Sequence, residues 1–218
     1  MVKARKTGAI FDLDGTILDS MPIWDNAGEM FLNKLGINAE PGLGKIMFAM
    51  CMTEGAEYLK ERYSLNMGID EIIAGINHTI QDFYFHQVQL KDGVKQFLIE
   101  MKQAGIPMAA ATSSDRKIVE RALERLDVIN FFDKILTCTE IGAGKEKPDI
   151  YFAAAEHMGT LPKDTWVFED ALHAIQTAKS AGFRTVGVYD ASSKENWGEI
   201  KKISEIYMEK LVYIKQFL

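Results

Sequence analysis

Past residue 90, short apolar runs alternate with segments that have the spacing of amphipathic helices. The runs are apolar at nearly every position, which is typical of strands buried on both faces of a sheet. The runs comprise residues 106–111, 135–137, 166–168 and 185–188, and the helical segments comprise 92–102, 115–126, 149–158 and 171–181. A further apolar run lies at 8–12. The alternation predicts an α/β fold built on a doubly wound parallel sheet.

Residues 17–88 interrupt this alternation, because they contain no apolar strand and follow helical spacing. Helical spacing is clear over residues 24–35, 55–63 and 69–85. An insertion directly after the first strand lies at the carboxyl edge of a parallel sheet, where such sheets bind ligands. We therefore predict a core domain of residues 1–16 and 89–218 and a helical cap domain of residues 17–88, placed to act as a lid. Residues 197–218 are predicted to dock on the sheet as an edge strand and a terminal helix.

Composition narrows the classes of function. The chain has 218 residues, of which 47% are hydrophobic, so it can bury a sizeable core. Its net charge of −6 argues against nucleic acid as a partner, since phosphate backbones are bound by clustered Lys and Arg. No stretch of the sequence approaches the roughly 18 apolar residues of a membrane span, and the two cysteines form no disulfide framework. We expect a cytoplasmic protein, and nothing in the sequence demands more than a monomer.

Two acidic residues follow the first apolar run. Asp12 and Asp14 are succeeded by Gly15, which permits a sharp exit from the strand. Residues i and i+2 of a strand point to the same side, so the two carboxylates would converge if the chain stays extended between them. Two like charges at this spacing are costly unless a cation or a bound proton neutralises one of them. The alternatives are an ordinary Asp-Gly turn and a calcium loop, and the calcium loop is disfavoured because further oxygen ligands do not follow at alternate positions.

Other predicted strands also end in polar residues. Thr112 and Ser113 follow the run at 106–111, and Glu169 and Asp170 follow the run at 166–168. Lys145 lies in a glycine-containing loop after the strand at 135–137. Taken singly, the hydroxyls and acids could serve only as helix caps, and Lys145 could be a solvated loop lysine. The carboxyl ends of parallel strands share one edge, so we expect four acids and one lysine to meet there and to bind a divalent cation and an anionic substrate.

The order of these motifs resembles the haloacid dehalogenase superfamily, in its phosphatase branch with a helical cap inserted after the first motif. The segment from Asp12 to Thr16 is similar to the first motif, and Thr112 to the hydroxyl motif. Lys145, with the Lys-Pro-Asp of residues 147–149, is similar to the lysine motif, and the pair at 169–170 to the terminal acidic motif. The resemblance spans nearly the whole chain.

The resemblance implies a mechanism with two catalytic aspartates and a metal ion. Asp12 would attack phosphorus and form an aspartyl-phosphate. Asp14 would protonate the leaving oxygen and later accept a proton from the attacking water. Mg²⁺ would be held by Asp12, the backbone carbonyl of Asp14, Glu169 and Asp170.

The resemblance also implies a set of phosphate ligands. Thr112 and Lys145 would hold the oxygens of the transferring phosphoryl group, and Ser113 would add a backbone N–H. The lysine motif contains a second candidate, Lys147, where many relatives have Lys-Pro-x-Pro. We prefer Lys145, because the spacing to the following Pro-Asp aligns it with the motif.

Asp14 also bears on the type of reaction. Dehalogenases of the superfamily lack an acid two residues after the nucleophile, because halide leaves without a proton, so an oxygen leaving group is implied. The leading hypothesis is a phosphatase that acts on a small phosphorylated metabolite. The alternative is a sugar phosphomutase resembling β-phosphoglucomutase, but such enzymes usually have a His after the first motif and an Arg in the cap. Here Trp24 occupies the first position, and residues 47–54 contain no Arg.

A catalytically idle, phosphate-binding module is a hypothesis of a different class, and the retention of every acid disfavours it. Three residues of the predicted cap, Trp24, Met47 and Met50, are candidates to line an apolar substrate pocket. The alternative is that each of them fills the helical core, which is the more common role of Met.

Overall fold

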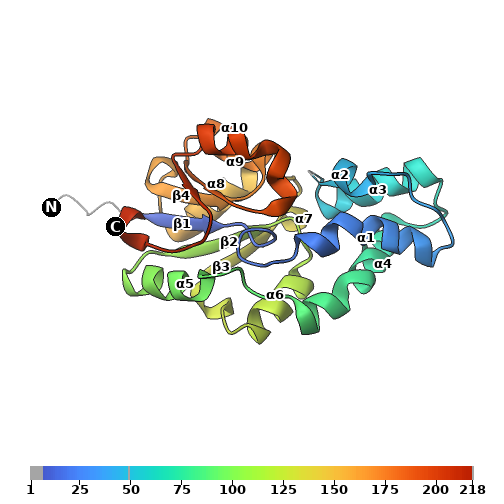
Figure 1. Ribbon diagram of the computed structural model, residues 1–218, viewed down its shortest axis with the longest axis horizontal. Helices are drawn as coiled ribbons and strands as arrows, with labels where there is room; N and C mark the ends of the chain where they lie inside the picture. The colour runs from blue at the N-terminus through green and yellow to red at the C-terminus, as the bar shows by residue number, and fades with distance from the viewer. Residues whose placement is uncertain (1–6, 49, 218) are drawn as a thin grey trace.

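The computed structural model describes residues 7–48 and 50–217, and its centre is a six-stranded parallel sheet (Figure 1). The strands lie in the order β3-β2-β1-β4-β5-β6, and every neighbouring pair is parallel. Their bounds are β1 Gly8–Phe11, β2 Met108–Thr112, β3 Lys134–Thr137, β4 Thr165–Glu169, β5 Arg184–Val188 and β6 Ile206–Met208. The prediction of a doubly wound parallel sheet is confirmed.

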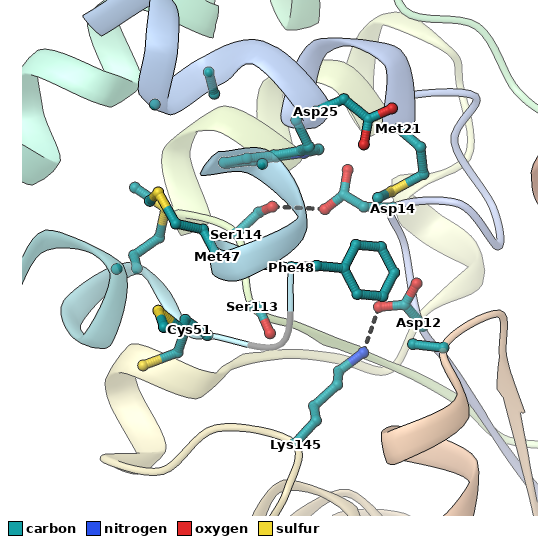
Figure 2. A pocket seen from close by; sticks show the side chains of 18 of the residues that line it. Asp12, Asp14, Met21, Asp25, Met47, Phe48, Cys51, Ser113, Ser114 and Lys145 are labelled. Carbon is teal, nitrogen blue, oxygen red and sulfur yellow. Dashed lines mark hydrogen bonds and ion pairs between the residues drawn. The ribbon is translucent and has the colours of Figure 1, made fainter. Parts of the chain in front are cut away.

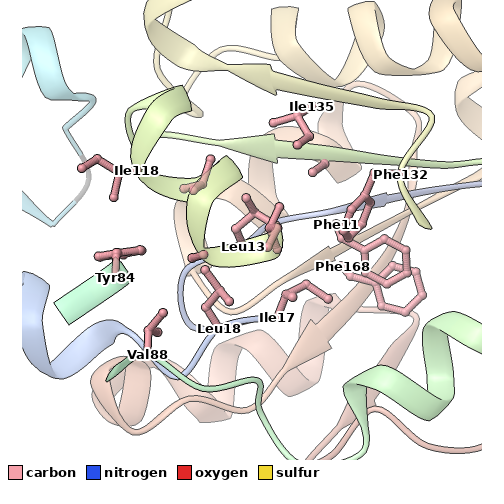
Figure 3. Packing of buried hydrophobic residues seen from close by; sticks show 14 of the residues in the cluster. Phe11, Leu13, Ile17, Leu18, Tyr84, Val88, Ile118, Phe132, Ile135 and Phe168 are labelled. Atoms are coloured by element: carbon pink, nitrogen blue, oxygen red, sulfur yellow. The ribbon is translucent and has the colours of Figure 1, made fainter. Parts of the chain in front are cut away.

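Helices cover both faces of the sheet, which is why its strands are apolar at successive positions. On one face Phe11 and Phe168 stack in a buried cluster with side chains of α5 and α6 (Figure 3). On the other face Ile10 and Val167 pack with side chains of α8 and α9. The helices of the core are α5 Val94–Gln103, α6 Arg116–Arg125, α7 Cys138–Ile141, α8 Asp149–Met158, α9 Leu172–Ser180 and α10 Trp197–Ile203.

The C-terminal region completes the sheet. Strand β6 pairs with β5 at the edge, as predicted for this region. The predicted terminal helix is a single 3₁₀ turn, η5 (Ile214–Phe217), rather than an α-helix. Its Phe217 is buried against the rings of Phe97, Trp166 and Phe168. Phe217 therefore anchors the 3₁₀ turn on the core.

In the described part of the chain, four helices and a π-helix lie between β1 and α5, beyond the carboxyl ends of the strands (Figure 1). They are α1 Met21–Lys34, α2 Leu43–Met47, α3 Met52–Tyr63, α4 Ile69–Asp82 and the π-helix η1 Phe83–Gln87, and we call them the helical block. Helix α4 buries Ile72, Ile76 and Ile80 along one face. This repeat at i, i+4 and i+8 is the apolar stripe that the sequence predicts for this segment.

Two adjacent segments of chain connect the helical block to the sheet. Leu18 and Leu90 form an antiparallel bridge. Asp19 N–H donates to the Gln89 carbonyl, and Lys91 N–H donates to the Ile17 carbonyl, both at 2.9 Å. The block therefore leaves and rejoins the core at one place, beside the loop that carries Asp14. Among the described residues, no helix is both long and apolar enough to cross a membrane.

Candidate active site

The end of β1 places Asp12 in contact with Lys145. Asp12 N–H donates to the Phe168 carbonyl at 3.0 Å, which extends the pairing of β1 with β4 by one residue. Lys145 Nζ donates to Asp12 Oδ1 (Figure 2). It also donates to Glu169 Oε1 at 2.7 Å. Both Asp12 and Lys145 are buried, and buried charges require such pairing. Sequence positions 133 residues apart thus form one ion pair at the sheet edge.

Three carboxylates meet at this point. Asp12, Glu169 and Asp170 each have a potential ligand atom within 4.8 Å of those of the other two, and all three residues are buried. Glu169 is also held by the hydroxyl of Tyr151, which donates to its Oε1 at 2.8 Å. Asp170 faces the hydroxyls of Thr16 and Ser193, each 3.5 Å away.

Burial of these charges shifts their pKa values. Burial raises the pKa of Asp12 well above its ordinary value, and the charge of Lys145 only partly opposes this effect. Burial also raises the pKa of Glu169. Burial and then the neighbouring Glu169 raise the pKa of Asp170 to about 8. Burial alone would lower the pKa of Lys145, but Asp12 and Glu169 raise it overall, so the lysine stays charged.

This cluster fits a hard divalent cation. One lysine opposes three carboxylates, so ionising all three would leave an excess of negative charge in a buried position. Asp12 Oδ2 is buried and has no hydrogen-bond partner among the described residues, although unpaired buried oxygens are costly. Carboxylate oxygens are the ligands that Mg²⁺, Ca²⁺ and Mn²⁺ prefer. A cation would satisfy the free oxygen and offset the excess charge.

Asp14 has different partners from Asp12. Its Oδ1 accepts hydrogen bonds from Ser20 Oγ at 2.6 Å and from the hydroxyl of Tyr84. Its Oδ2 accepts one from Ser114 Oγ at 2.6 Å (Figure 2). The same oxygen lies 3.5 Å from Thr112 Oγ1. Strand β1 ends at Phe11, so the Asp14 side chain is placed by the turn that follows and not by continued strand pairing.

Gly15 allows that turn to pass close to the acidic cluster. Its φ of +85° lies in the left-handed region that glycine tolerates. A Cβ at this position would lie 2.6 Å from Asp170 Oδ2. The glycine predicted as a strand exit therefore also makes room for a carboxylate of the cluster.

The residues predicted to bind phosphate divide into two groups. Ser113 and Lys145 line the pocket above the acidic cluster. Thr112 is fully buried, and its hydroxyl lies beside Asp14 and accepts the backbone N–H of Ser114 at 3.0 Å. Its contact with phosphate stays a prediction. Lys147 is exposed, whereas Lys145 reaches Asp12, which supports the preference for Lys145.

The helical block supplies the other wall of the pocket. Trp24, Met47 and Met50 all line it, and their contact with a substrate stays a prediction. Phe48 extends from the end of α2 toward the acidic residues (Figure 2). Its ring packs edge-on against that of His173, with 6.3 Å between the ring centroids. The remaining apolar lining of the block includes Met21, Ala27, Cys51, Met52 and Ile76. Lys145 is the sole lysine or arginine that lines this pocket in the described part of the chain.

Sequence reasoning missed four residues of the site. Ser114 lies in the predicted hydroxyl run, but its bond to Asp14 depends on the turn after β2. Tyr84 is 70 positions from Asp14, and burial raises its pKa well above the ordinary value, which keeps it a neutral donor. Tyr151 and His173 look like helix-packing residues, and burial lowers the pKa of His173 to about 4. No local pattern marks any of these contacts.

Comparison with known proteins gives a consistent result. A family model described as haloacid dehalogenase-like hydrolase matches residues 9–188. A phosphorylated carbohydrates phosphatase of Thermotoga maritima is 25% identical over 177 residues, covering 81% of this chain and 82% of the relative. The fructose-1-phosphate phosphatase YqaB of Escherichia coli is 28% identical over 196 residues, covering 84% of this chain and 97% of the relative.

Solved structures share the fold. The crystal structure of CbbY from Rhodobacter sphaeroides in complex with phosphate has a TM-score of 0.83 to this chain at 19% identity, with 96% of each chain covered. The family match runs from β1 to β5 and includes the helical block. The chain therefore belongs to the haloacid dehalogenase-like hydrolases.

Proposed function

We propose that this protein is a Mg²⁺-dependent phosphomonoester hydrolase that acts on a small phosphorylated metabolite through an aspartyl-phosphate. The observation that carries the proposal is the placement of Asp12, Asp14 and Lys145 around one pocket. The phosphatase names of the relatives support it, since the two described above act on phosphorylated carbohydrates and on fructose 1-phosphate.

Asp12 and Asp14 perform the two halves of the reaction. A carboxylate oxygen of Asp12 attacks phosphorus, the bond from phosphorus to the ester oxygen breaks, and Asp14 gives that oxygen its proton. Water then attacks the aspartyl-phosphate and gives a proton to Asp14. The bond from phosphorus to Asp12 breaks, and inorganic phosphate and free enzyme result.

The other polar residues bind the metal ion or the phosphoryl group. Asp12, Glu169, Asp170 and the backbone carbonyl of Asp14 would hold Mg²⁺, which offsets negative charge on the phosphoryl oxygens when it is bound. Lys145, Thr112 and the backbone N–H of Ser113 bind the remaining phosphoryl oxygens. Thr112 must turn from Asp14 toward the substrate to do so.

The pocket favours a substrate with one phosphate. Lys145 is beside Asp12, and the wall formed by the helical block offers no second cation among its described residues. A bisphosphate would leave its second group unpaired against apolar side chains. In this proposal residues 17–88 act as a cap domain, and Trp24, Met47 and Met50 contact the leaving group.

The test is phosphate release from a panel of phosphorylated metabolites, with Mg²⁺ and with EDTA. We expect Mg²⁺-dependent release by the wild type, and Asp12→Asn should lower kcat at least 10³-fold while the melting temperature and circular dichroism stay native. Substantial activity in Asp12→Asn would contradict the nucleophile assignment. The panel includes β-glucose 1-phosphate with its 1,6-bisphosphate, and conversion to glucose 6-phosphate without free phosphate would establish the mutase instead.

A further inference from the structure

Tyr84 connects the helical block to Asp14. It belongs to the π-helix η1 and is fully buried, and its hydroxyl donates to Asp14 Oδ1. The same hydroxyl accepts a hydrogen bond from Trp24 Nε1, on α1. Tyr84 is absent from the described residues that line the pocket, so it does not act on the substrate directly.

The direction of these hydrogen bonds is determined by chemistry. An indole N–H can only donate, so the Tyr84 oxygen is the acceptor in its bond to Trp24. A phenol has one proton, and with the acceptor side occupied, that proton points to Asp14 Oδ1. A tyrosine without the Trp24 bond could instead accept from a protonated Asp14.

The two oxygens of Asp14 are therefore not equivalent. Oδ1 receives the fixed donor of Tyr84, and Ser20 Oγ lies 2.6 Å from the same oxygen. Oδ2 faces Ser114, which lines the pocket and whose hydroxyl can rotate to accept as well as to donate. Among the described residues, neither Tyr84 nor Ser20 lines the pocket, so Oδ1 is held away from it, whereas Oδ2, which also lies 3.5 Å from Thr112 Oγ1, is on the side of the pocket.

We propose that Tyr84, held by Trp24, is a positioning residue that orients the Asp14 carboxyl group so that Oδ2 lies beside the pocket. The inference rests on the proposed function, in which Asp14 protonates the leaving oxygen. As the phosphorus–oxygen bond breaks, Asp14 gives its proton to the leaving oxygen from the side of Oδ2 and becomes a carboxylate whose Oδ1 is already hydrogen-bonded. The helical block thus orients the acid without touching the reacting atoms.

The test is the leaving-group dependence of Tyr84→Phe, which keeps the ring and removes the hydroxyl. A series of aryl phosphates from p-nitrophenyl phosphate to phenyl phosphate varies the need for a proton. We expect kcat/KM of Tyr84→Phe to fall about 10- to 100-fold for phenyl phosphate and less than about threefold for p-nitrophenyl phosphate. Trp24→Phe, which frees the phenol to rotate, should show the same selectivity with a smaller loss.

Two comparisons separate positioning from a structural role. Tyr58→Phe removes another tyrosine hydroxyl that donates to a carboxylate of the block, Glu40, and should leave the leaving-group dependence unchanged. In an Asp14→Asn background, Tyr84→Phe should have no further selective effect, because the residue acts through Asp14. Equal losses for all aryl phosphates, or additive losses with Asp14→Asn, would overturn the inference. A wild type that hydrolyses no phosphomonoester would overturn the proposed function itself.

Discussion

At the scale of single residues, Asp170 of the acidic cluster is expected to lower the free energy of unfolding when no cation is bound. Its pKa of about 8 lies above the value of about 3.9 in an unfolded chain. The folded state therefore binds more protons between about pH 4 and pH 8, and the stability of the metal-free protein falls as pH rises through this window. If Mg²⁺ binds the folded state, as the proposed function requires, it should restore this stability above pH 8.

Asp170→Asn isolates this effect. The substitution removes a buried charge, so we expect the metal-free variant to be more stable than wild type by about 1–3 kcal/mol at pH 8, with little difference at pH 4. The rise in melting temperature caused by Mg²⁺ should disappear. Calorimetry with Mg²⁺ and with EDTA measures the stability of the metal-free protein and the rise in melting temperature that Mg²⁺ causes. Asp133→Asn, which changes an exposed carboxylate, is the matched control. A metal-free variant that is less stable than wild type at pH 8 would contradict the prediction.

Residues in motifs were predictable, and their partners were not. Asp12, Lys145 and Glu169 meet because parallel strands end at one edge, and that geometry follows from the sequence pattern. Tyr84 and Ser114 reach Asp14 only through the path of the helical block and of the turn after β2. Such contacts depend on side-chain positions across the fold, which periodicity does not determine.

At the scale of elements, the segment that returns from the helical block is fastened by Lys91. Its Nζ donates to the backbone carbonyls of Gly15 and Tyr189. It also donates to Asp190 Oδ2 at 2.8 Å. The Lys91 and Asp190 side chains are only 16% and 8% exposed, so solvent screens the pair weakly. One side chain thus joins the loop after β1 to the loop after β5.

Lys91→Met should destabilise the protein by about 3 kcal/mol, because it leaves Asp190 buried without its cation. Urea denaturation measures the free energy of unfolding, and adding Asp190→Asn should recover part of the loss. Lys95→Met is the matched control, since its exposed pair with Asp127 should be worth no more than about 0.5 kcal/mol. Similar losses in the Lys91 and Lys95 variants would refute this role of Lys91.

Periodicity predicted the elements better than their ends. The helix expected over 69–85 is an α-helix to Asp82 and then a five-residue π-helix. The apolar pattern does not distinguish the two, because both bury one face, although the wider turn changes the direction of later side chains. Tyr84 lies in that π-helix, so the misjudged element is the one that carries an unpredicted contact of the site.

At the scale of the whole molecule, the helical block and the core also meet through an ion pair next to Gly44, which lines the pocket; we call this contact the rim. Lys45 Nζ on α2 lies 2.7 Å from Glu195 Oε1. Glu195 belongs to the 3₁₀ helix η4 (Ala191–Asn196) of the core. The two side chains are 77% and 79% exposed, so the pair is weak and is screened by salt. The rim is therefore a contact that can open easily, unlike the connection at Lys91.

Charge reversal at this rim tests whether the block must rest on the core during binding. Lys45→Glu would place like charges across the mouth of the pocket, and Asp25 would add to the repulsion because it already acts on Lys45. We expect KM to rise about two- to threefold at low ionic strength and to return to the wild-type value near 0.5 M salt, where the Debye length is only about 4 Å. Lys45→Glu combined with Glu195→Lys should restore KM at low salt, because it rebuilds the pair in reverse. A KM increase that persists in salt and in the reversed pair would mean that Lys45 acts on the substrate rather than on the position of the block.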